Sequence, residues 1–251
     1  MLLAIDSGNT RTKWAVFDSL GSIKAQGVCT NTDLNAMAIP TIWHACQRIT
    51  ISNVAGTLIA AILNKLLRPL KIPIRWIVAS VQACGLENSY ANPAQLGTDR
   101  WAAMIAAWQQ FQKPCIVVNA GTALTVDAIS AERSENHGIF LGGIIMPGLM
   151  LMQNSLILGA ADISGHAGSF QDFPTSTGTA VYTGALTAMA GAVETMFYKL
   201  QQLVDSAPLC IINGGDAASL ATILNKKMEN HLVVTDNLVL QGLLFLEREA
   251  P

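Results

Sequence analysis

The stretch that decides the fold reads Asp6-Ser7-Gly8-Asn9-Thr10-Arg11-Thr12-Lys13, and it follows directly on the apolar run Leu2–Ile5. An acidic side chain at the end of a buried strand is costly unless it is paired or binds a metal. Gly8 lets the backbone turn sharply and approach a ligand closely. The polar residues after it, with the backbone N–H groups, can then face an anion. The stretch therefore indicates a phosphate-binding β-hairpin, although an ordinary turn with Gly and Asn stays open as an alternative.

A second stretch of the same kind lies near the middle of the chain. Val117-Val118-Asn119-Ala120-Gly121-Thr122-Ala123 echoes Ala4-Ile5-Asp6-Ser7-Gly8-Asn9-Thr10. Both stretches follow an apolar strand and open a meander, and repetition in the same context indicates an internal duplication. We expect Thr122 and Thr125 to donate hydrogen bonds to phosphate oxygens. A plain pair of threonine-rich strands is the alternative.

The order of the predicted elements repeats as well. Hydrophobic periodicity predicts strands at 2–5, 12–17, 22–28, 51–54 and 74–78, with helices at 34–48, 57–67 and 100–112. After residue 114 it predicts strands at 115–118, 124–129, 138–141, 209–212 and 232–234, with helices at 181–203, 217–224 and 238–247. We therefore expect an α/β protein of two similar domains, residues 1–113 and 114–251, that meet at a tightly packed cleft.

Two further motifs carry chemistry. Asn213-Gly214-Gly215-Asp216 lies between a strand and a helix and permits close approach to a nucleotide, although Gly-Gly also ends many ordinary turns. Leu96-Gly97-Thr98-Asp99-Arg100-Trp101 places an acid and a base where a loop enters a helix. Asp99 is either a first-turn acid that stabilises the helix or a general base that accepts a hydroxyl proton. In the second case Arg100 binds a substrate carboxylate.

Composition and charge exclude several classes of protein. Hydrophobic residues make up 51% and charged residues 13%, which is typical of a well-packed globular protein and not of a disordered chain. A net charge of −2 provides no basic field for nucleic acid. The apolar run 142–158 is interrupted by Pro147, Gln153 and Asn154 and is a poor membrane span.

The cysteines and the N-terminal residues indicate the compartment of the protein. Five scattered cysteines without a CxxC motif favour reduced thiols over disulfides or a zinc site. The N-terminal residues lack the basic and apolar regions of a signal peptide. We therefore expect a cytoplasmic protein.

Taken together, these motifs resemble the type III pantothenate kinases, a family that includes proteins described as Bvg accessory factors. The resemblance covers nearly the whole chain and rests on LGTDRW at 96–101, VVNAGTALTVDAI at 117–129 and GGIIMPGL at 142–149, in this order and spacing. It implies the actin-like ATPase superfold, with two ribonuclease-H-like domains and ATP in the cleft. It also implies transfer of the γ-phosphate to the 4′-hydroxyl of pantothenate, the first step of coenzyme A synthesis.

The resemblance implies roles for individual residues and names the cofactors. The ATP phosphates would meet Asp6, Ser7, Gly8, Asn9, Thr10, Arg11, Thr12, Lys13 and Thr122. The substrate would meet Tyr90, Gly97, Thr98, Asp99, Arg100 and Thr177, with Asp99 as the proton acceptor. Magnesium would accompany ATP, with Asp6 as its ligand, because phosphoryl transfer needs a cation to neutralise developing charge. The resemblance and the apolar run 142–158 together predict a homodimer with the substrate near the subunit interface.

One position departs from the family pattern. Many members carry Asp at the start of the second phosphate motif, where it binds a monovalent cation such as potassium or ammonium. This chain has Asn119 there, and an amide offers a carbonyl oxygen but no charge. We therefore expect a weaker dependence on potassium than in members that carry Asp.

Two other functions stay open. Another small-molecule kinase of the same superfamily, such as a sugar or acetate kinase, usually has inserted subdomains, for which 251 residues leave little room. A non-catalytic regulatory protein of the same fold would be favoured by loss of Asp6 or Asp99, and both are present.

Overall fold

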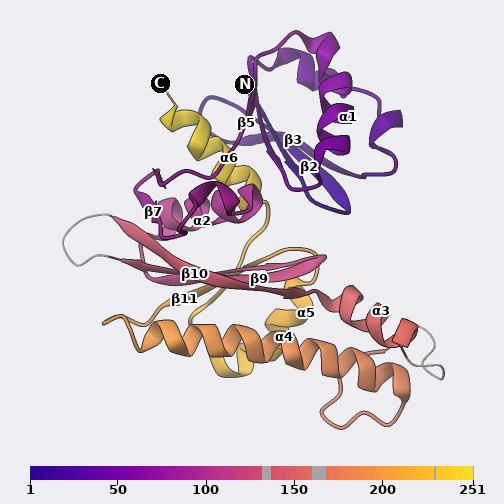
Figure 1. Cartoon of the computed structure of the whole chain (residues 1–251), viewed down its shortest axis with the longest axis vertical. Helices are drawn as coiled ribbons and strands as arrows, with labels where there is room; N and C mark the ends of the chain where they lie inside the picture. The colour runs from indigo at the N-terminus through magenta and orange to yellow at the C-terminus, as the bar shows by residue number, and fades with distance from the viewer. Residues whose placement is uncertain (132–136, 160–167, 229, 251) are drawn as a thin grey trace. The chain divides into compact units, whose positions relative to one another are not determined.

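The computed structural model describes residues 1–131, 137–159, 168–228 and 230–250, and the chain forms two compact units (Figure 1). The first unit comprises Met1–Phe111 and Asn237–Pro251, and the second comprises Gln112–Asp236. Each unit combines α-helices with strands of a mixed sheet.

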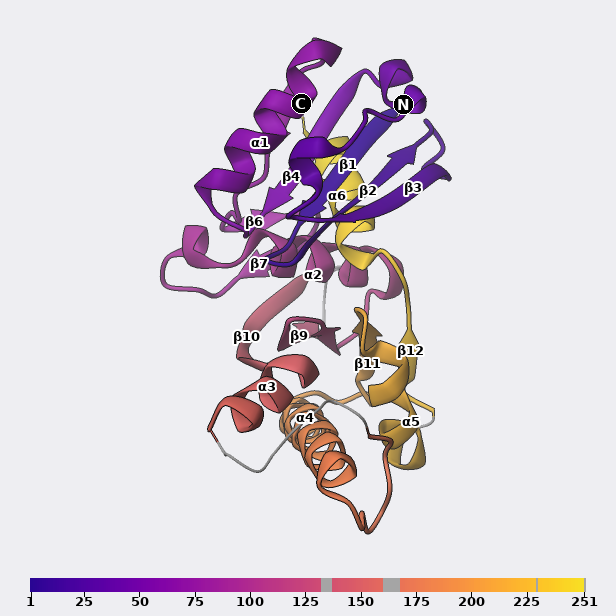
Figure 2. The ribbon, with the colours of Figure 1, turned by 90° about the vertical axis from the view of Figure 1, so that its right-hand side faces the viewer.

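The sheet of the first unit has the strand order β3-β2-β1-β4-β5 (Figure 2). Its strands are β1 (Leu2–Ser7), β2 (Arg11–Phe17), β3 (Ile23–Thr30), β4 (Arg48–Asn53) and β5 (Ile74–Trp76). The first three form an antiparallel meander, and β4 and β5 extend it in parallel. Alternation along the strands places Leu3, Ile5, Trp14 and Val16 on one face, in a core shared with helix α1 (Thr57–Leu67).

Two helices, α2 (Thr98–Phe111) and α6 (Leu238–Glu249), pack against each other in the same unit. A Cβ atom on Gly242 would lie 1.8 Å from the carbonyl oxygen of Ala102, so the helix backbones touch and only glycine fits. Glu247 of α6 accepts hydrogen bonds from Thr50 Oγ1 at 2.7 Å and from Arg48 Nη1 at 3.1 Å. These contacts hold α6 against β4 as well as against α2. A short hairpin of β6 (Gln82–Ala83) and β7 (Leu86–Asn88) precedes α2.

The second unit repeats the plan of the first. An antiparallel meander of β8 (Cys115–Ala120), β9 (Ala123–Ala131) and β10 (Gly138–Pro147) is continued in parallel by β11 (Leu209–Asn213) and β12 (Leu232–Val234). Its helices are α3 (Leu149–Gly159), α4 (Thr177–Gln201) and α5 (Ala217–Met228). Val118 and Ile212 from the sheet share a core with Met189 of α4 and Leu220 of α5. Both units thus continue a three-stranded meander with parallel strands, as a duplicated fold would.

One predicted helix is wrong. The apolar spacing over residues 34–48 predicted a single helix, but the structure has short 3-10 turns at Leu34–Ala36 and Thr41–Ala45, followed by β4. Pro40 lies between the two turns and cannot continue a helix, because it has no N–H and restricts the residue before it. The apolar residues of this segment, among them Leu34 and Trp43, are buried all the same.

The predicted domain limits also need correction. The division after residue 113 lies close to the observed one after Phe111, but residues 114–251 do not form one unit. The last helix, α6, belongs to the first unit, because its apolar face is buried against α2 and the first sheet. Hydrophobic periodicity identifies such a helix but not the surface on which it packs.

The apolar run at 142–158 forms the end of β10 and most of α3. Within the described ranges, no helix combines the length and the apolar character needed to cross a membrane.

Candidate functional site

The first hairpin joins β1 to β2 through a turn at Gly8, whose N–H donates to the carbonyl oxygen of Arg11 at 3.1 Å. In the strand register Asp6 lies opposite Lys13, and Ser7 lies opposite Thr12. Because side chains alternate along a strand, Asp6 and Lys13 share one face of the sheet. Ser7 and Thr12 share the other.

The side chains of Ser7 and Thr12 brace the hairpin from within. They are 0% and 2% exposed, and their hydroxyl oxygens lie 3.0 Å apart. Thr12 Oγ1 also donates to Asn31 Oδ1 at 2.9 Å. The hydroxyls of Ser7 and Thr12 are turned into the protein, so a contact of these two residues with phosphate would have to come from their backbone. Asn9, Thr10, Arg11 and Lys13 are exposed on the hairpin.

Asn31, just after β3, is a residue of this site that the sequence did not reveal. Its Nδ2 donates to the carbonyl oxygens of Gly8 at 2.8 Å and Asn9 at 3.0 Å, and its N–H donates to that of Thr10 at 3.0 Å. No local pattern links residue 31 to residues 8–10. Only the pairing of β2 with β3 brings them together.

Asp6 has an unusual environment for a carboxylate. Among the described residues, its Oδ1 is buried without a hydrogen-bond partner. Burial, and after it the negative charge of Asp99, raise the pKa of Asp6 to about 7, although Lys13 opposes the shift. A buried, unpartnered carboxylate oxygen fits a divalent cation, because a hard cation supplies the missing charge and the missing bond.

Asp99 lies in the first turn of α2, near Asp6. Its Oδ1 accepts a hydrogen bond from the N–H of Arg100 at 2.8 Å, and burial raises its pKa. A Cβ atom on Gly97 would lie 2.7 Å from this oxygen, so glycine makes room for the carboxylate.

The first turn of α2 is anchored to the sheet through Thr98. The hydroxyls of Thr98 and Ser52 lie 2.9 Å apart, and Ser52 is next to Asp6 in the strand register. The predicted metal ligand and the predicted base are therefore held near each other by β1, β4 and α2.

Arg100 and Tyr90 form a second part of the same site. Arg100 is 5% exposed, and its Nη1 donates to the hydroxyl oxygen of Tyr90 at 3.0 Å, with the guanidinium 5.8 Å from the ring centre. Asn88 Oδ1 accepts from the N–H of Tyr90 at 3.1 Å and fixes the start of this loop. An orientated guanidinium of this kind can bind a carboxylate through parallel hydrogen bonds.

In the second unit three motifs converge on the turn between β8 and β9. Gly148 donates its N–H to the carbonyl oxygen of Thr122 at 3.0 Å, and a Cβ atom there would lie 2.0 Å from the carbonyl oxygen of Gly121. Gly214 has a φ of 110°, and a Cβ atom there would lie 2.2 Å from the carbonyl oxygen of Ala120. Thr122 itself is exposed. The glycines thus allow backbone to pack on backbone and leave the turn open to a ligand.

Asn119 is half-buried on β8, opposite Thr125 on β9 and beside Asn213 on β11. The Oγ1 atom of Thr125 is buried and has no hydrogen-bond partner in the described part of the chain. Asn213 Nδ2 donates to the carbonyl oxygen of Val118 at 3.1 Å. The group around Asn119 is therefore polar and rich in oxygen, with the nearest acid on β9 at Asp127, two positions beyond Thr125.

Thr177 is the exposed first residue of the 25-residue helix α4 in the second unit. Ser176 before it donates to Thr179 Oγ1 at 2.9 Å. This places Thr177 at a helix N-terminus, which is favourable for an anion or a polar ligand group.

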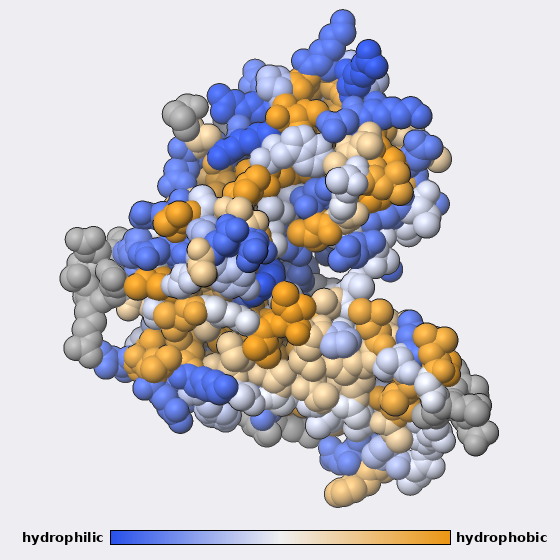
Figure 3. Space-filling model, viewed as in Figure 1, coloured by the Kyte–Doolittle hydropathy of each residue, from blue (hydrophilic) through white to orange (hydrophobic). Residues whose placement is uncertain are grey.

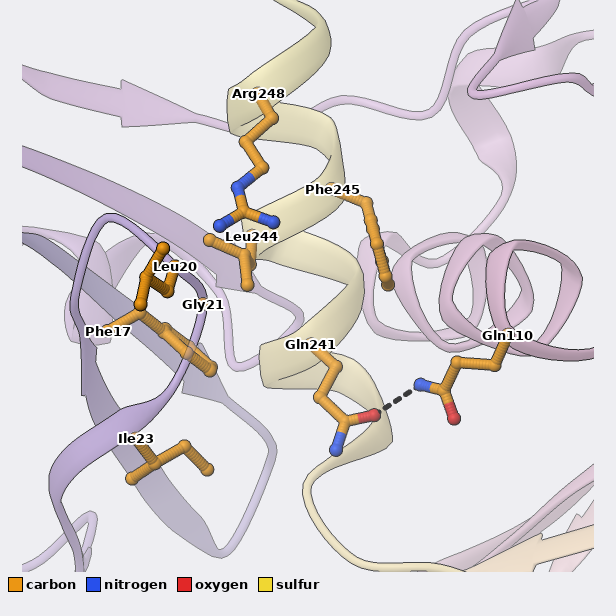
Figure 4. A pocket seen from close by; sticks show the side chains of 9 residues that line it. All are labelled: Phe17, Leu20, Gly21, Ile23, Gln110, Gln241, Leu244, Phe245 and Arg248. Carbon is orange, nitrogen blue, oxygen red and sulfur yellow. Dashed lines mark hydrogen bonds between the residues drawn. The ribbon is translucent and has the colours of Figure 1, made fainter.

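A separate pocket of about 320 Å³ lies in the first unit, at the end of β2 remote from the hairpin turn (Figure 4). Its lining is Phe17, Leu20, Gly21, Ile23, Gln110, Gln241, Leu244, Phe245 and Arg248. Arg248 Nη2 is held by the carbonyl oxygen of Ser19, and Gln110 Nε2 donates to Gln241 Oε1. None of the predicted site residues lines this pocket.

Comparison with known proteins gives a consistent result. A family model described as type III pantothenate kinase matches residues 2–199. A type III pantothenate kinase from Methylobacillus flagellatus is 49% identical over 252 residues, covering 100% of this chain and 99% of the relative.

Solved structures agree on the fold. A putative Baf family transcriptional activator from Campylobacter jejuni is 22% identical and covers 98% of both chains, with a TM-score of 0.62. A putative 2-dehydro-3-deoxygalactonokinase from Sinorhizobium meliloti is 12% identical and covers 99% of this chain and 98% of its own, with a TM-score of 0.55. The two-unit architecture is therefore that of the actin-like ATPases and sugar kinases.

The raised pKa of Asp6 predicts a pH-dependent stability. The folded protein holds a proton on Asp6 up to about pH 7, whereas the unfolded chain releases it near the ordinary value of 3.8. The folded state therefore loses stability as pH rises between these values. Between pH 5 and 7.5, the free energy of unfolding should fall more steeply for the wild type than for Asp6→Asn.

Tryptophan fluorescence during urea unfolding measures this effect, because all five tryptophans lie in the first unit. They are Trp14, Trp43, Trp76, Trp101 and Trp108. Asp18→Asn is the control, since hydrogen bonding from the N–H of Ser22 lowers the pKa of Asp18 and moves its effect to a more acidic range. Parallel curves for the wild type and Asp6→Asn would contradict the assignment.

Proposed function

The chain belongs to the type III pantothenate kinase family, and on that premise we propose that it transfers the γ-phosphoryl group of ATP to the 4′-hydroxyl of pantothenate. The observation that carries the proposal is the grouping of two partly buried carboxylates with raised pKa values, Asp6 and Asp99, with the Arg100–Tyr90 pair in one unit. In this proposal Asp6 holds the metal, Asp99 accepts the hydroxyl proton and the guanidinium of Arg100 binds the substrate carboxylate.

Asp99 is the general base of the proposed reaction. A carboxylate whose pKa is raised by burial accepts a proton more readily than an ordinary one. The hydrogen bond from the N–H of Arg100 holds its Oδ1 in place. Arg100 and Tyr90 orientate pantothenate by its carboxylate, so that the hydroxyl reaches Asp99.

Asp6 is the residue that would hold magnesium. Within the described ranges no three His, Cys, Asp or Glu side chains form a metal-binding group. Magnesium does not need such a group, since it is commonly held by one or two carboxylates, here Asp6, together with phosphate oxygens and water. Bound there, the ion would neutralise charge on the phosphates during transfer.

The two hairpins hold the phosphates in this proposal. The first offers its backbone around Gly8, with Asn9, Thr10, Arg11 and Lys13 exposed beside it. The second offers Thr122 on a turn that three glycines keep open. Backbone N–H groups on such turns bind anions without a helix N-terminus. Thr177, at the start of α4, is the proposed contact of the second unit with pantothenate.

We place the enzyme in the cytoplasm, and the thiols support this. All five cysteines are free in the structure, including Cys115 and Cys210, which are buried on neighbouring strands. Reduced, unpaired thiols are typical of that compartment.

The proposed reaction is tested with Asp99→Asn. Turnover of ATP with pantothenate should fall by roughly 100-fold or more, the scale of the loss of a general base. Binding of ATP, measured by calorimetry, should stay close to that of the wild type, because the amide keeps the size of the carboxylate. Sugars and acetate serve as alternative acceptors. Near-wild-type turnover of the variant would remove Asp99 from this role, and turnover with a sugar but not with pantothenate would favour another kinase.

Potassium dependence is the second test, and it concerns Asn119. Its amide supplies one neutral oxygen where a carboxylate would supply charge, so affinity for a monovalent cation should be low. Turnover in sodium and in potassium buffers of equal ionic strength should differ little for the wild type and more for Asn119→Asp. A wild-type enzyme that is inactive in sodium and restored by millimolar potassium would show that Asn119 still builds a working cation site.

The active form in this proposal is a homodimer, and α3 supplies its apolar contact. Figure 3 shows apolar side chains over β10 and α3. Those of Ile145, Met150, Leu151 and Leu156 are 63%, 50%, 43% and 45% exposed. A contiguous apolar patch of this kind marks an association surface.

Light scattering tests the homodimer. The wild type should be dimeric at micromolar concentration, and Leu151→Glu should weaken association by roughly tenfold or more, the loss of about 1.4 kcal/mol at a buried contact. Leu58→Glu on α1, at a site that is 73% exposed in the first unit, is the control. A wild type that is monomeric and fully active would contradict the proposal.

A further inference from the structure

Asn31 holds the turn of the first hairpin from outside. Its amide group donates from Nδ2 to the carbonyl oxygens of Gly8 and Asn9, at 2.8 and 3.0 Å. Its main-chain N–H donates to the carbonyl oxygen of Thr10 at 3.0 Å. Three successive carbonyl groups of the turn are therefore directed toward one residue.

This arrangement determines where the N–H groups of the turn point. In a trans peptide the C=O and N–H bonds lie in one plane and point in opposite directions. The carbonyl of Gly8 shares its peptide unit with the N–H of Asn9, and the carbonyl of Asn9 shares its unit with that of Thr10. By directing both carbonyls toward itself, Asn31 turns both N–H groups the other way, as an anion-binding turn requires.

Asn31 is itself fixed in position. Thr30 Oγ1 donates to Asp33 Oδ2 at 2.6 Å, and the N–H of Asp33 donates to the carbonyl oxygen of Thr30 at 3.2 Å, which closes a tight turn around Asn31. On the other side, Asn31 Oδ1 accepts from the buried hydroxyl of Thr12. A donor at Oδ1 and two acceptors at Nδ2 thus fix the rotamer of Asn31 and the orientation of its amide.

The hydrogen bonds of the side chain leave no donor for a ligand. A carboxamide has two N–H bonds, and here both are directed to turn carbonyls. Asn31 therefore cannot add an amide contact to phosphate without giving up one of these bonds. Any effect of this residue on catalysis must act through the turn.

We propose that Asn31 is a positioning residue for phosphoryl transfer, which presents the N–H groups of Asn9 and Thr10 to the phosphates of ATP. The proposal rests on the proposed function of the first hairpin. It adds a residue that acts on the phosphates through the backbone of the turn. A turn that is organised before binding does not have to be ordered by the nucleotide, and this preserves affinity. It also keeps the γ-phosphate in line with the acceptor hydroxyl.

The variant that isolates the two donors is Asn31→Asp. It keeps the size of the side chain and the oxygen that faces Thr12, but it places an oxygen against two carbonyl oxygens. Asn31→Ala removes all hydrogen bonds of the side chain. Thr12→Val keeps both donors of Asn31 and removes the hydroxyl that bonds to Asn31 Oδ1 and to Ser7. Asp18→Ala is the matched control, because Asp18 Oδ1 braces the opposite turn of β2 by accepting from the N–H groups of Leu20 and Ser22.

Binding of magnesium–ADP by calorimetry is the first measurement, and the steady-state constants for ATP and pantothenate are the second. For Asn31→Asp and Asn31→Ala, kcat/KM for ATP should fall by about 100-fold, the scale of a misplaced reacting group. Affinity for magnesium–ADP should fall with it, while KM for pantothenate stays within about twofold. For Thr12→Val, which removes the hydrogen bonds to Ser7 and Asn31, kcat/KM for ATP should fall by only about tenfold.

A purely structural role gives a different pattern. Asn31→Asp would then lower the unfolding midpoint as Asp18→Ala does and reduce the amount of active enzyme, with KM for ATP and affinity for magnesium–ADP unchanged. That result would overturn the proposal. Failure of the proposed function is distinguishable, since the wild type itself would then neither bind magnesium–ADP nor phosphorylate pantothenate.

Discussion

The carboxylate of Asp6 near the end of β1, with its buried Oδ1, is the constraint on which the rest of the site depends. Removing an ionised group from water costs several kcal/mol unless a partner replaces the lost hydration. Here one oxygen has no partner among the described residues, and a second acid, Asp99, adds to the cost. Folding alone gives no reason for this arrangement. A cation and a triphosphate would supply the charge and the ligands that Asp6 lacks.

The elements around Asp6 are stabilised strongly enough to hold its carboxylate in an unfavourable environment. The hairpin is internally braced by Ser7, Thr12 and Asn31, and the first turn of α2 is anchored to β4 through Thr98 and Ser52. Helix α6 then supports α2 through the contact at Gly242. The polar groups of the site are thus carried by regular elements with well-packed cores, and these can hold them in an otherwise unfavourable environment.

In the second unit, backbone contacts at glycines hold the corresponding turn, where the first unit uses side-chain hydrogen bonds. Its turn between β8 and β9 is held by direct backbone contact with Gly148 and Gly214. Both units thus start from a strand–turn–strand motif of similar sequence and stabilise the turn differently. The similarity explains why a repeat is visible in the sequence, and the difference explains why it is short.

Local sequence determined the elements and the chemistry at their ends. Strand periodicity and the glycines of the turns suffice to predict the two meanders, since each depends on neighbours within a few residues. The kinase-like fold was implied by the family resemblance, and the roles of Asp6, Asp99 and Arg100 stay predictions. Tertiary structure alone decided the rest. It turned Ser7 and Thr12 inward, brought Asn31 to Gly8 from 23 residues away and returned α6 to the first unit. It also replaced the helix expected over 34–48 by turns around Pro40. These outcomes depend on which surfaces pack together. A pattern of polar and apolar residues identifies the face that is buried but not the surface against which it packs.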